Sequence, residues 1–241
     1  MAKEEQPEPE VKEGVIDSVN PANLKMNVFE AIATRRSIRK FTSQDVPMEI
    51  LGVVIDAGRY APTGSNSQNV HYVVLTSLDQ IAELRKMTIN FYDKMFSRIR
   101  GRFGMFIVSL VAGRKIAEYL RESFPKLDYA NELIKQGKDR LFYHAPVVIL
   151  AHAESWDRSS FFNCSVALYN CSLMAHTLRL GCCFNGILVN ATNLSRKIKG
   201  WLGIPADHKC YSAMTLGFPD ARYLRLVRRH PPKVDKIMRA P

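Results

Sequence analysis

The stretch Arg35-Arg36-Ser37-Ile38-Arg39-Lys40-Phe41 is the most informative part of this chain. Side chains of an extended segment alternate between two sides, so we expect Arg35, Ser37 and Arg39 to share one side. Arg36 then faces the other way. Two guanidinium groups that flank a hydroxyl suit a phosphate, because arginine donates in pairs and serine adds a short donor. The alternative for such a basic run is a solvated surface or a nucleic-acid contact.

Composition narrows the classes of protein. The chain has 241 residues, of which 46% are hydrophobic, which suits one globular domain with a large core or two small ones. The net charge of +11 favours anionic partners such as phosphates, nucleic acid or anionic membranes. The sequence has no apolar run of about 18 residues that could span a membrane, and its acidic start lacks an apolar signal core. We therefore expect a cytoplasmic protein that does not act at a membrane.

The cysteines point to the same compartment. They form no C-x-x-C pair, and no His/Cys cluster has the spacing of zinc ligands. We expect reduced and mostly buried thiols, and no bound metal. The five are Cys164, Cys171, Cys182, Cys183 and Cys210.

Apolar periodicity divides the chain into elements. Residues 1–24 are rich in Glu and Pro and are expected to form a flexible acidic arm, so that one domain spans residues 25–241. Helices are predicted at 28–34 after Asn27, from Pro47 to about residue 60 with Ser43 or Asp45 as cap, at 78–87, at 159–180 with Gly181 as C-cap residue, and from Asn193 or Ser195 to residue 201. Strands are predicted at 71–76, 144–151 and 211–217, and residues 182–188 are expected to form a strand or a strand-like turn.

Two helical segments need a separate interpretation. The helix 159–180 is apolar nearly all round, so it belongs in a large core or at a subunit interface. Residues 89–140 form a helical excursion whose aromatic residues are either core or the wall of a substrate pocket. Strands that alternate with helices predict an α/β or α+β sandwich with one mixed sheet.

The segment 61–69 is a polar loop between a buried helix and a buried strand. Its amide, hydroxyl and backbone groups offer hydrogen-bond donors and acceptors at a place that can hold a ligand. An ordinary turn is the other explanation.

Four motifs in this order resemble the FMN-dependent nitroreductase family: residues 35–41 (RRSIRKF), 61–68 (APTGSNSQ), 145–149 (APVVI) and 216–219 (LGFP). The resemblance spans residues 27–235. It implies an α+β, nitroreductase-like three-layer sandwich in which helices flank a mixed central sheet. It also implies a homodimer with FMN at the subunit interface and NAD(P)H as electron donor.

The resemblance assigns cofactor contacts residue by residue. Arg35 and Ser37 would hold the FMN phosphate with help from Arg36, and Arg39 would reach the ribityl chain or the N1/C2 side of the ring. The loop of the partner subunit would line the ribityl chain and the ring edge with Pro62, Thr63, Gly64, Asn66 and Gln68. Backbone groups near flavin N5 would come from Asn185, Gly186 and Ile187. Arg228 and Arg229 would close the phosphate site.

The chain departs from the family pattern at three places. The loop continues with Asn69-Val70 where Pro-Trp is frequent, and Phe184-Asn185 stand where Trp is frequent. Asn163 lies near the start of the long helix, where an acidic residue is common. These departures concern what lies above the flavin ring, and therefore which substrate is reduced.

The expected function is that of an FMN-dependent oxidoreductase. It would pass hydride from NAD(P)H through flavin to an electron-poor acceptor such as a nitroaromatic or quinone, in a ping-pong cycle without a catalytic side chain, since flavin N5 carries the hydride. A cation such as Arg39 would favour the reduced flavin. Alternatives are other flavin chemistry on the same fold (enone reduction, dehalogenation or substrate oxidation) and a basic nucleic-acid-binding protein, for which the sequence lacks a recognised motif.

Overall fold

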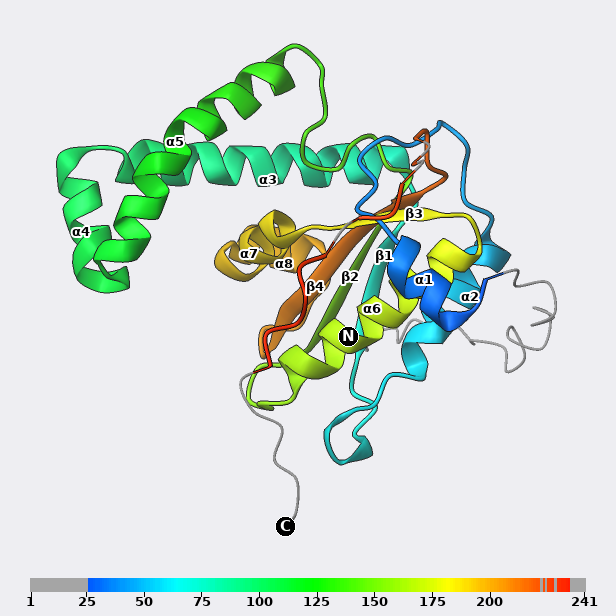
Figure 1. Cartoon of the computed structure of the whole chain (residues 1–241). Coiled ribbons are helices and arrows are strands. Elements are labelled where there is room, and N and C mark those ends of the chain that lie inside the picture. Colours follow the sequence, from blue (N-terminus) through cyan, green and yellow to red (C-terminus); the bar gives the residue numbers. More distant parts are fainter. Residues whose placement is uncertain (1–25, 222, 224, 228, 235–241) are drawn as a thin grey trace, which may run out of the picture.

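The computed structural model describes residues 26–221, 223, 225–227 and 229–234 (Figure 1). The expected acidic arm, residues 1–24, lies outside the described residues. The elements follow in the order α1 (Val28–Thr34), α2 (Met48–Arg59), a short 3₁₀ helix (Gly64–Asn66), β1 (His71–Leu75), α3 (Leu78–Ile99), α4 (Arg102–Ala112), α5 (Arg114–Lys135), β2 (Val147–Glu154), α6 (Ser160–Thr177), β3 (Gly181–Phe184), α7 (Gly186–Leu194), α8 (Arg196–Trp201) and β4 (His208–Gly217).

The strands form one sheet in the order β1-β2-β4-β3, and all three neighbouring pairs are antiparallel. The expected mixed sheet is therefore wrong for the described strands. β2 and β3 do run in the same direction and are joined through α6, as the alternation of strand and helix predicts. However, β4 is inserted antiparallel between them, so they are not neighbours. The described chain adds a single parallel pairing, an isolated bridge from Ser37 to Cys182.

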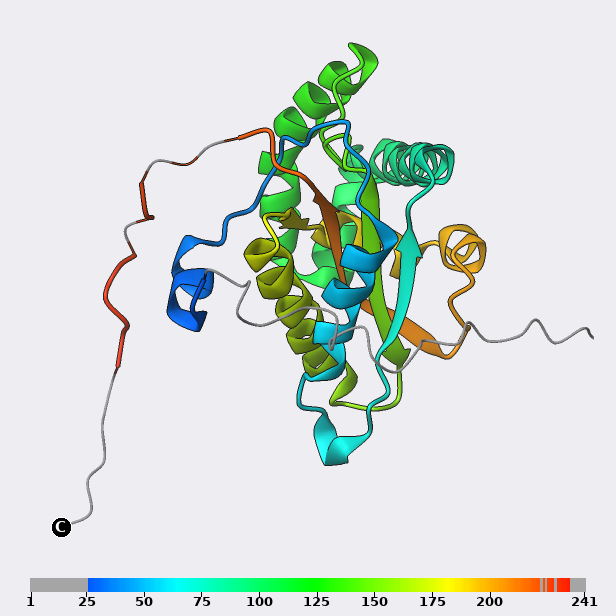
Figure 2. The same cartoon turned by 90° about the vertical axis from the view of Figure 1, so that its right-hand side faces the viewer.

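Helices cover both faces of this sheet, which makes three layers (Figures 1 and 2). Val147 and Ile149 of β2 pack with α2 and α6 in one buried cluster, whereas Val148 and Leu150 pack with α3, α7 and α8 in another. This division follows from the alternation of side chains along a strand. Each fully buried aliphatic side chain of this kind contributes about 1.5–3 kcal/mol, so β2 is central to the stability of both layers.

The helical excursion projects from the sheet as an arm (Figure 1). α3 runs without a break from Leu78 to Ile99, so it passes through the boundary expected at residue 89. α4 and α5 fold back against its far end around a small separate cluster that includes Phe96, Met105 and Phe124. At these positions the core interpretation of the apolar residues is confirmed.

Two local expectations are wrong around β3. The stretch 182–188 is not one strand, because β3 ends at Phe184 and Asn185 caps the new helix α7. Gly181 is not the C-cap residue of α6 either: Leu178 is, and Gly181 begins β3. Its missing side chain serves close packing, since a Cβ there would lie 2.5 Å from Cγ1 of Ile38.

The start of α2 also differs from the expectation. Neither Ser43 nor Asp45 caps it, because Pro47 occupies the N-cap position without a side-chain hydrogen bond. In contrast, the predicted cap of α1 is confirmed, with Asn27 and Glu30 in a reciprocal capping box.

The five cysteines are free and buried, as their pattern predicts. No helix in the described part of the chain combines the length and apolar character that a membrane span requires.

Candidate functional site

The basic strip, residues 35–41, runs along the outer edge of β3. Ile38 N donates to Cys182 O at 2.9 Å, and further along Thr42 N donates to Phe218 O at 2.9 Å. Ile38 is buried against Gly181, which fixes the position of the strip on the sheet. The strip is therefore part of the rigid body of the protein.

Arg35 carries an unusual guanidinium group. Its Nε and Nη1 atoms are buried and have no hydrogen-bond partner among the described residues. Its Cζ lies 6.0 Å from the centre of the Tyr169 ring on α6. A buried donor without a partner costs about 1–3 kcal/mol, and more when the group is charged. These two donor atoms are therefore available to an anionic ligand.

A pocket of about 370 Å³ opens beside this guanidinium. Arg35, Arg36 and Arg179 all line it, and no Asp or Glu does among the described residues. Arg36 stacks on Tyr223 at 5.4 Å and donates from Nη2 to the carbonyl of Arg225. Such a pocket attracts anions.

The simple alternation expected for the strip is wrong. Arg36 lines the same pocket as Arg35, whereas Ser37 and Arg39 do not line it. The reason is that the described strip forms only isolated bridges, at Ser37 and Phe41, and no regular strand.

The positive charge of Arg35 lowers the pKa of two neighbouring groups, against the effect of burial at Cys182 and together with it at His176. Burial raises the pKa of the Cys182 thiol to about 11, and the positive charge of Arg35 opposes that rise. Burial and the same charge lower the pKa of His176, whose Nε2 lies 2.7 Å from Thr34 Oγ1. The positive charge of the pocket therefore comes from its arginines.

Arg39 lies further along the basic strip, close to Cys183 of β3. It is exposed, and its Cζ is 5.9 Å from the centre of the Tyr143 ring. The pKa of its guanidinium is raised mainly by Cys183 and also by Tyr143. Since Cys183 and Phe184 lead directly into α7, Arg39 is on the side of the strip nearer the start of that helix.

Asn185, Gly186 and Ile187 form the start of α7. The Asn185 side chain is buried and fully engaged, because Oδ1 accepts from Leu188 N at 2.9 Å and Nδ2 donates to Leu141 O at 2.8 Å. Gly186 and Ile187 are exposed, and their N–H groups belong to the first turn, which has no intrahelical acceptor. Asn185 thus positions the turn, and the two residues after it present donors.

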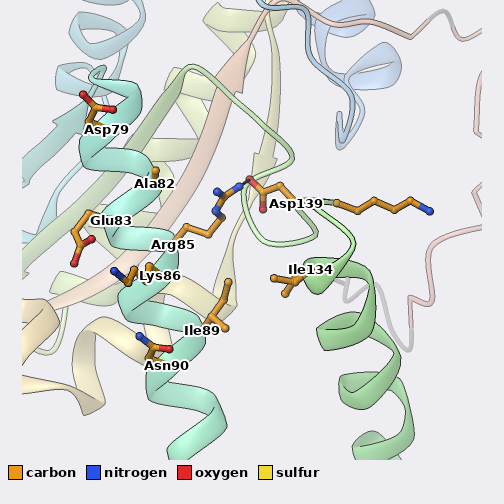
Figure 3. A pocket seen from close by; sticks show the side chains of 11 residues that line it. Asp79, Ala82, Glu83, Arg85, Lys86, Ile89, Asn90, Ile134 and Asp139 are labelled. Atoms are coloured by element: carbon orange, nitrogen blue, oxygen red, sulfur yellow. Dashed lines mark ion pairs between the residues drawn. The ribbon is translucent and has the colours of Figure 1, made fainter.

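Asp139 lies in a pocket beside α3 (Figure 3) and holds the segment whose Leu141 carbonyl accepts from Asn185. The pocket in this view holds about 460 Å³ between α3 and the end of α5. Asp139 is buried there, accepts from the N–H groups of Leu141 and Phe142, and pairs with Arg85 at 3.3 Å. These contacts fix the segment that carries Tyr143 and the carbonyl held by Asn185. The carboxylate of Asp139 therefore has a structural role.

The polar loop is ordered, although most of it is exposed. Ser65, Asn66 and Gln68 have positive φ angles of 53°, 54° and 49°. Thr63 Oγ1 accepts from Gln68 N at 3.0 Å, whereas Pro62 is exposed and Gly64 N is held from outside the loop.

Asn163 is the residue that holds the loop, and its role could not be read from the sequence. It is fully buried on α6, its Oδ1 accepts from Gly64 N at 3.1 Å and its Nδ2 donates to Asn69 Oδ1 at 3.1 Å. A carboxylate could accept from Gly64 but could not donate to Asn69, so the amide suits both partners. The one indication in the sequence was that Asn163 stands at a position where an acidic residue is common in the family that the motifs resemble.

The loop and the basic strip lie at opposite ends of the sheet. The loop leads into His71, which pairs with His152 near the end of β2, whereas the strip meets Gly217 and Gly181, near the start of β2. The two ends of β2, Val147 and Glu154, are seven residues apart, which at about 3.3 Å per residue is a distance of about 23 Å. Figures 1 and 2 show the loop and the strip at opposite ends of the sheet.

One chain therefore does not bring all the expected contacts together. Arg229 is exposed on the C-terminal tail, which leads away from the body (Figure 2). Among the described residues no hydrogen bond or ion pair joins it to the strip. Arg228 lies outside the described residues.

Comparison with known proteins agrees with this fold. The model of the nitroreductase family matches residues 32–218. A protein of Methanothermobacter thermautotrophicus with the provisional name NADH dehydrogenase/NAD(P)H nitroreductase is 24% identical over 199 residues, which cover 81% of this chain and 78% of that protein. Mouse iodotyrosine deiodinase 1 is 24% identical over 220 residues, covering 87% and 68%.

Solved structures extend the similarity to the whole fold. A nitroreductase with bound FMN from Bacteroides fragilis superposes with a TM-score of 0.60 at 20% identity, covering 89% of this chain and 99% of that one. The family match covers most of the sequence and both expected cofactor segments. The chain thus belongs to the nitroreductase family, the group of flavoprotein oxidoreductases that its motifs resemble.

Proposed function

We propose that residues 25–241 form one FMN-binding domain of an NAD(P)H-dependent oxidoreductase that reduces an electron-poor acceptor such as a nitroaromatic or a quinone. The observation that carries this proposal is Arg35, whose buried Nε and Nη1 atoms have no hydrogen-bond partner in the described part of the chain, at a pocket that no described Asp or Glu lines. FMN supplies the hydride chemistry when bound, and the protein supplies binding and electrostatics.

The residues present fit the phosphate end of FMN. Arg35 would offer its free Nε and Nη1 as charge-assisted donors, with Arg36 close by in the same pocket. Ser37, held on the strip beside Cys182 but outside the lining of this pocket, would add its hydroxyl donor only at the edge of the phosphate site. Arg179 also lines this pocket and was not expected from the sequence.

The ring end of FMN would lie toward α7. The N–H groups of Gly186 and Ile187 point out of the helix start, where the helix dipole favours electron-rich atoms. Arg39 lies on the same side and would stabilise negative charge on the reduced ring. A Cβ at Gly186 would meet no atom within 4 Å, so there is open space beside this turn.

A homodimer is part of the proposal, because the loop that would line the ring cannot reach the strip within one chain. Apolar side chains that a second copy could cover are exposed on α1 and α6: Phe29 is 78% exposed, Phe161 63% and Phe162 59%. Patches of this kind mark protein interfaces. Two identical sites at an isologous interface follow from twofold symmetry.

The first experiment is the visible spectrum of the purified protein, with identification of any released chromophore. About one FMN per chain, oxidation of NADH or NADPH, and transfer to nitroaromatics or quinones would support the proposal. A colourless protein that does not bind added FMN would contradict it.

Subunit mixing tests the origin of the loop. We would unfold and refold together an Arg35→Met variant and an Asn66→Ala/Gln68→Ala variant, each of which should bind FMN weakly alone. If the loop comes from the partner, a mixed dimer has one intact site, so random assembly gives tight binding in about one chain in four. If the loop acts within its own chain, no tight sites appear.

Reductive dehalogenation is a second candidate, supported by the similarity to mouse iodotyrosine deiodinase 1 at the same identity as the archaeal relative. Dehalogenation and nitroaromatic reduction are distinguished by supplying the reduced protein with 3-iodotyrosine and, in parallel, with a nitroaromatic. Release of iodide at a rate above that of nitroaromatic reduction would favour dehalogenation.

A further inference from the structure

Three histidines and a glutamate meet on one face of the sheet, far from the basic strip. His71 begins β1, His152 and Glu154 lie on β2, and His208 begins β4. The strand register pairs His71 with His152 and Glu154 with His208, so these side chains are cross-strand neighbours. They form the histidine cluster at the end of the sheet.

The histidine cluster has the geometry of a ligand set. Ligand atoms of His71, Glu154 and His208 all lie within 4.8 Å of one another. Two histidines and one carboxylate are a common set for a divalent transition metal, which binds nitrogen and oxygen at about 2.0–2.2 Å. Each of these atoms needs to move by about 1 Å or less to meet one ion. We propose that His71, Glu154 and His208 bind a divalent transition-metal ion of the zinc class.

His152 prepares His208 for this role. Their Nδ1 atoms are 2.9 Å apart, which requires one ring to donate to the lone pair of the other. When His208 donates from Nδ1, its lone pair is on Nε2 and is available to a metal. A second group that fixes the tautomer of a ligand histidine in this way is typical of metal sites.

Glu154 is also held in place. Its Oε2 accepts from Asn69 Nδ2 at 2.9 Å, and its backbone carbonyl accepts from Tyr211 OH at 3.3 Å. Lys199, the nearby cation, directs its ammonium group to the carbonyls of Ala206 and His208. It therefore does not occupy the space between the three ligands.

The site is open to solvent on one side, because His71 is exposed on the edge strand while His208 is buried. An ion would enter past His71 and would link β1 to β4 across β2. Through Asn69 it would also stabilise the end of the polar loop. The role that follows is structural, and it does not depend on the proposed flavin chemistry.

The test uses the full chain without a polyhistidine tag, with and without FMN. Zn²⁺ is titrated against a chromophoric chelator, and Mg²⁺ serves as the comparison ion. His71→Ala and Glu154→Gln remove ligands from positions that are not fully buried, and His230→Ala removes an exposed histidine outside the cluster. Circular dichroism checks that each variant is folded.

We expect one Zn²⁺ per chain, a melting temperature that rises by several degrees with zinc, and binding weakened by about 100-fold in both ligand variants. The His230→Ala variant should bind like the parent. Absence of tight zinc binding, binding unchanged in the ligand variants, or thiolate absorption in the Co²⁺ form would each overturn the assignment.

Discussion

Replacement of Arg35 by methionine should change two properties in opposite directions. Methionine keeps much of the length and apolar volume of the side chain but removes the charge and the donors. In the cofactor-free protein the unsatisfied Nε and Nη1 atoms of Arg35 destabilise the fold by about 1–3 kcal/mol, against about 0.5–1 kcal/mol gained from the Tyr169 ring. The variant should therefore be more stable by about 0.5–2 kcal/mol, which corresponds to a melting temperature higher by roughly 2–6 °C.

FMN binding should be weakened by the same substitution. Two charge-assisted hydrogen bonds to a phosphate contribute about 3–4 kcal/mol together, so the dissociation constant should rise by about 100- to 1,000-fold. Riboflavin lacks the phosphate, and its affinity should change by less than about threefold.

The assay combines differential scanning calorimetry of the cofactor-free protein with flavin fluorescence titrations. Arg196→Gln, at an exposed arginine on α8, is the matched control. If Arg35→Met melts below the parent protein, the guanidinium has a structural role. Equal losses for FMN and riboflavin would mean that it does not contact the phosphate. Either result would refute the reasoning.

Four further substitutions test how the residues of the candidate site are held in place. Asn163→Ala should release the polar loop, which would appear as faster hydrogen exchange at residues 63–69 and FMN binding weakened by about tenfold; unchanged exchange would contradict the anchoring role. Asn185→Ala should cost about 2–3 kcal/mol in urea unfolding, because a cap and a buried carbonyl partner are lost, and a loss below about 0.5 kcal/mol would refute this. Gly181→Ala should cost about 1–3 kcal/mol through its clash with Ile38, whereas Gly186→Ala, which meets no atom, should be near neutral; equal effects would remove the packing argument.

Local sequence patterns predicted most elements but not how the strands pair. Asn27, the apolar period of α2 and the β-branched run before Leu75 act over a few residues, so each could be interpreted alone. The position of β4 between β2 and β3 depends on pairing between distant segments, for which the sequence gives no local signal. This is why the antiparallel order was missed while the helices on either side were expected.

Gly181 illustrates a different limit. Glycine after a long helix usually marks a C-cap, and that rule predicted its place. In this protein the residue with positive φ is Arg179, at 63°, and glycine is required two positions later by the approach of Ile38. A C-cap and a close approach both require glycine, so the sequence alone does not distinguish them. The position of Ile38 in the folded chain does.

The sequence indicated the residues proposed to contact the cofactor more clearly than the residues that hold them in place. The arginines of the strip and the amides of the loop stand out in the sequence because they are the residue types that the proposed contacts with phosphate and ring edges need. Asn163 and Asp139 carry no such signal, since their partners are backbone groups of distant segments. The histidine cluster was missed for the same reason, because His71 and His208 are adjacent only through the register of three strands.

Helix α6 lies between the proposed dimer interface and the proposed phosphate site at Arg35. The helix buries Cys164, Leu168 and Cys171 within its own chain, so the expected burial in a core accounts for one side of it. Its exposed side carries Phe161 and Phe162 at one end, and Tyr169, 37% exposed, lies beside Arg35. A second copy that covers this side would also exclude water from the pocket beside the guanidinium. Exclusion of water strengthens the attraction between arginine and phosphate, so dimer formation and FMN binding should stabilise each other.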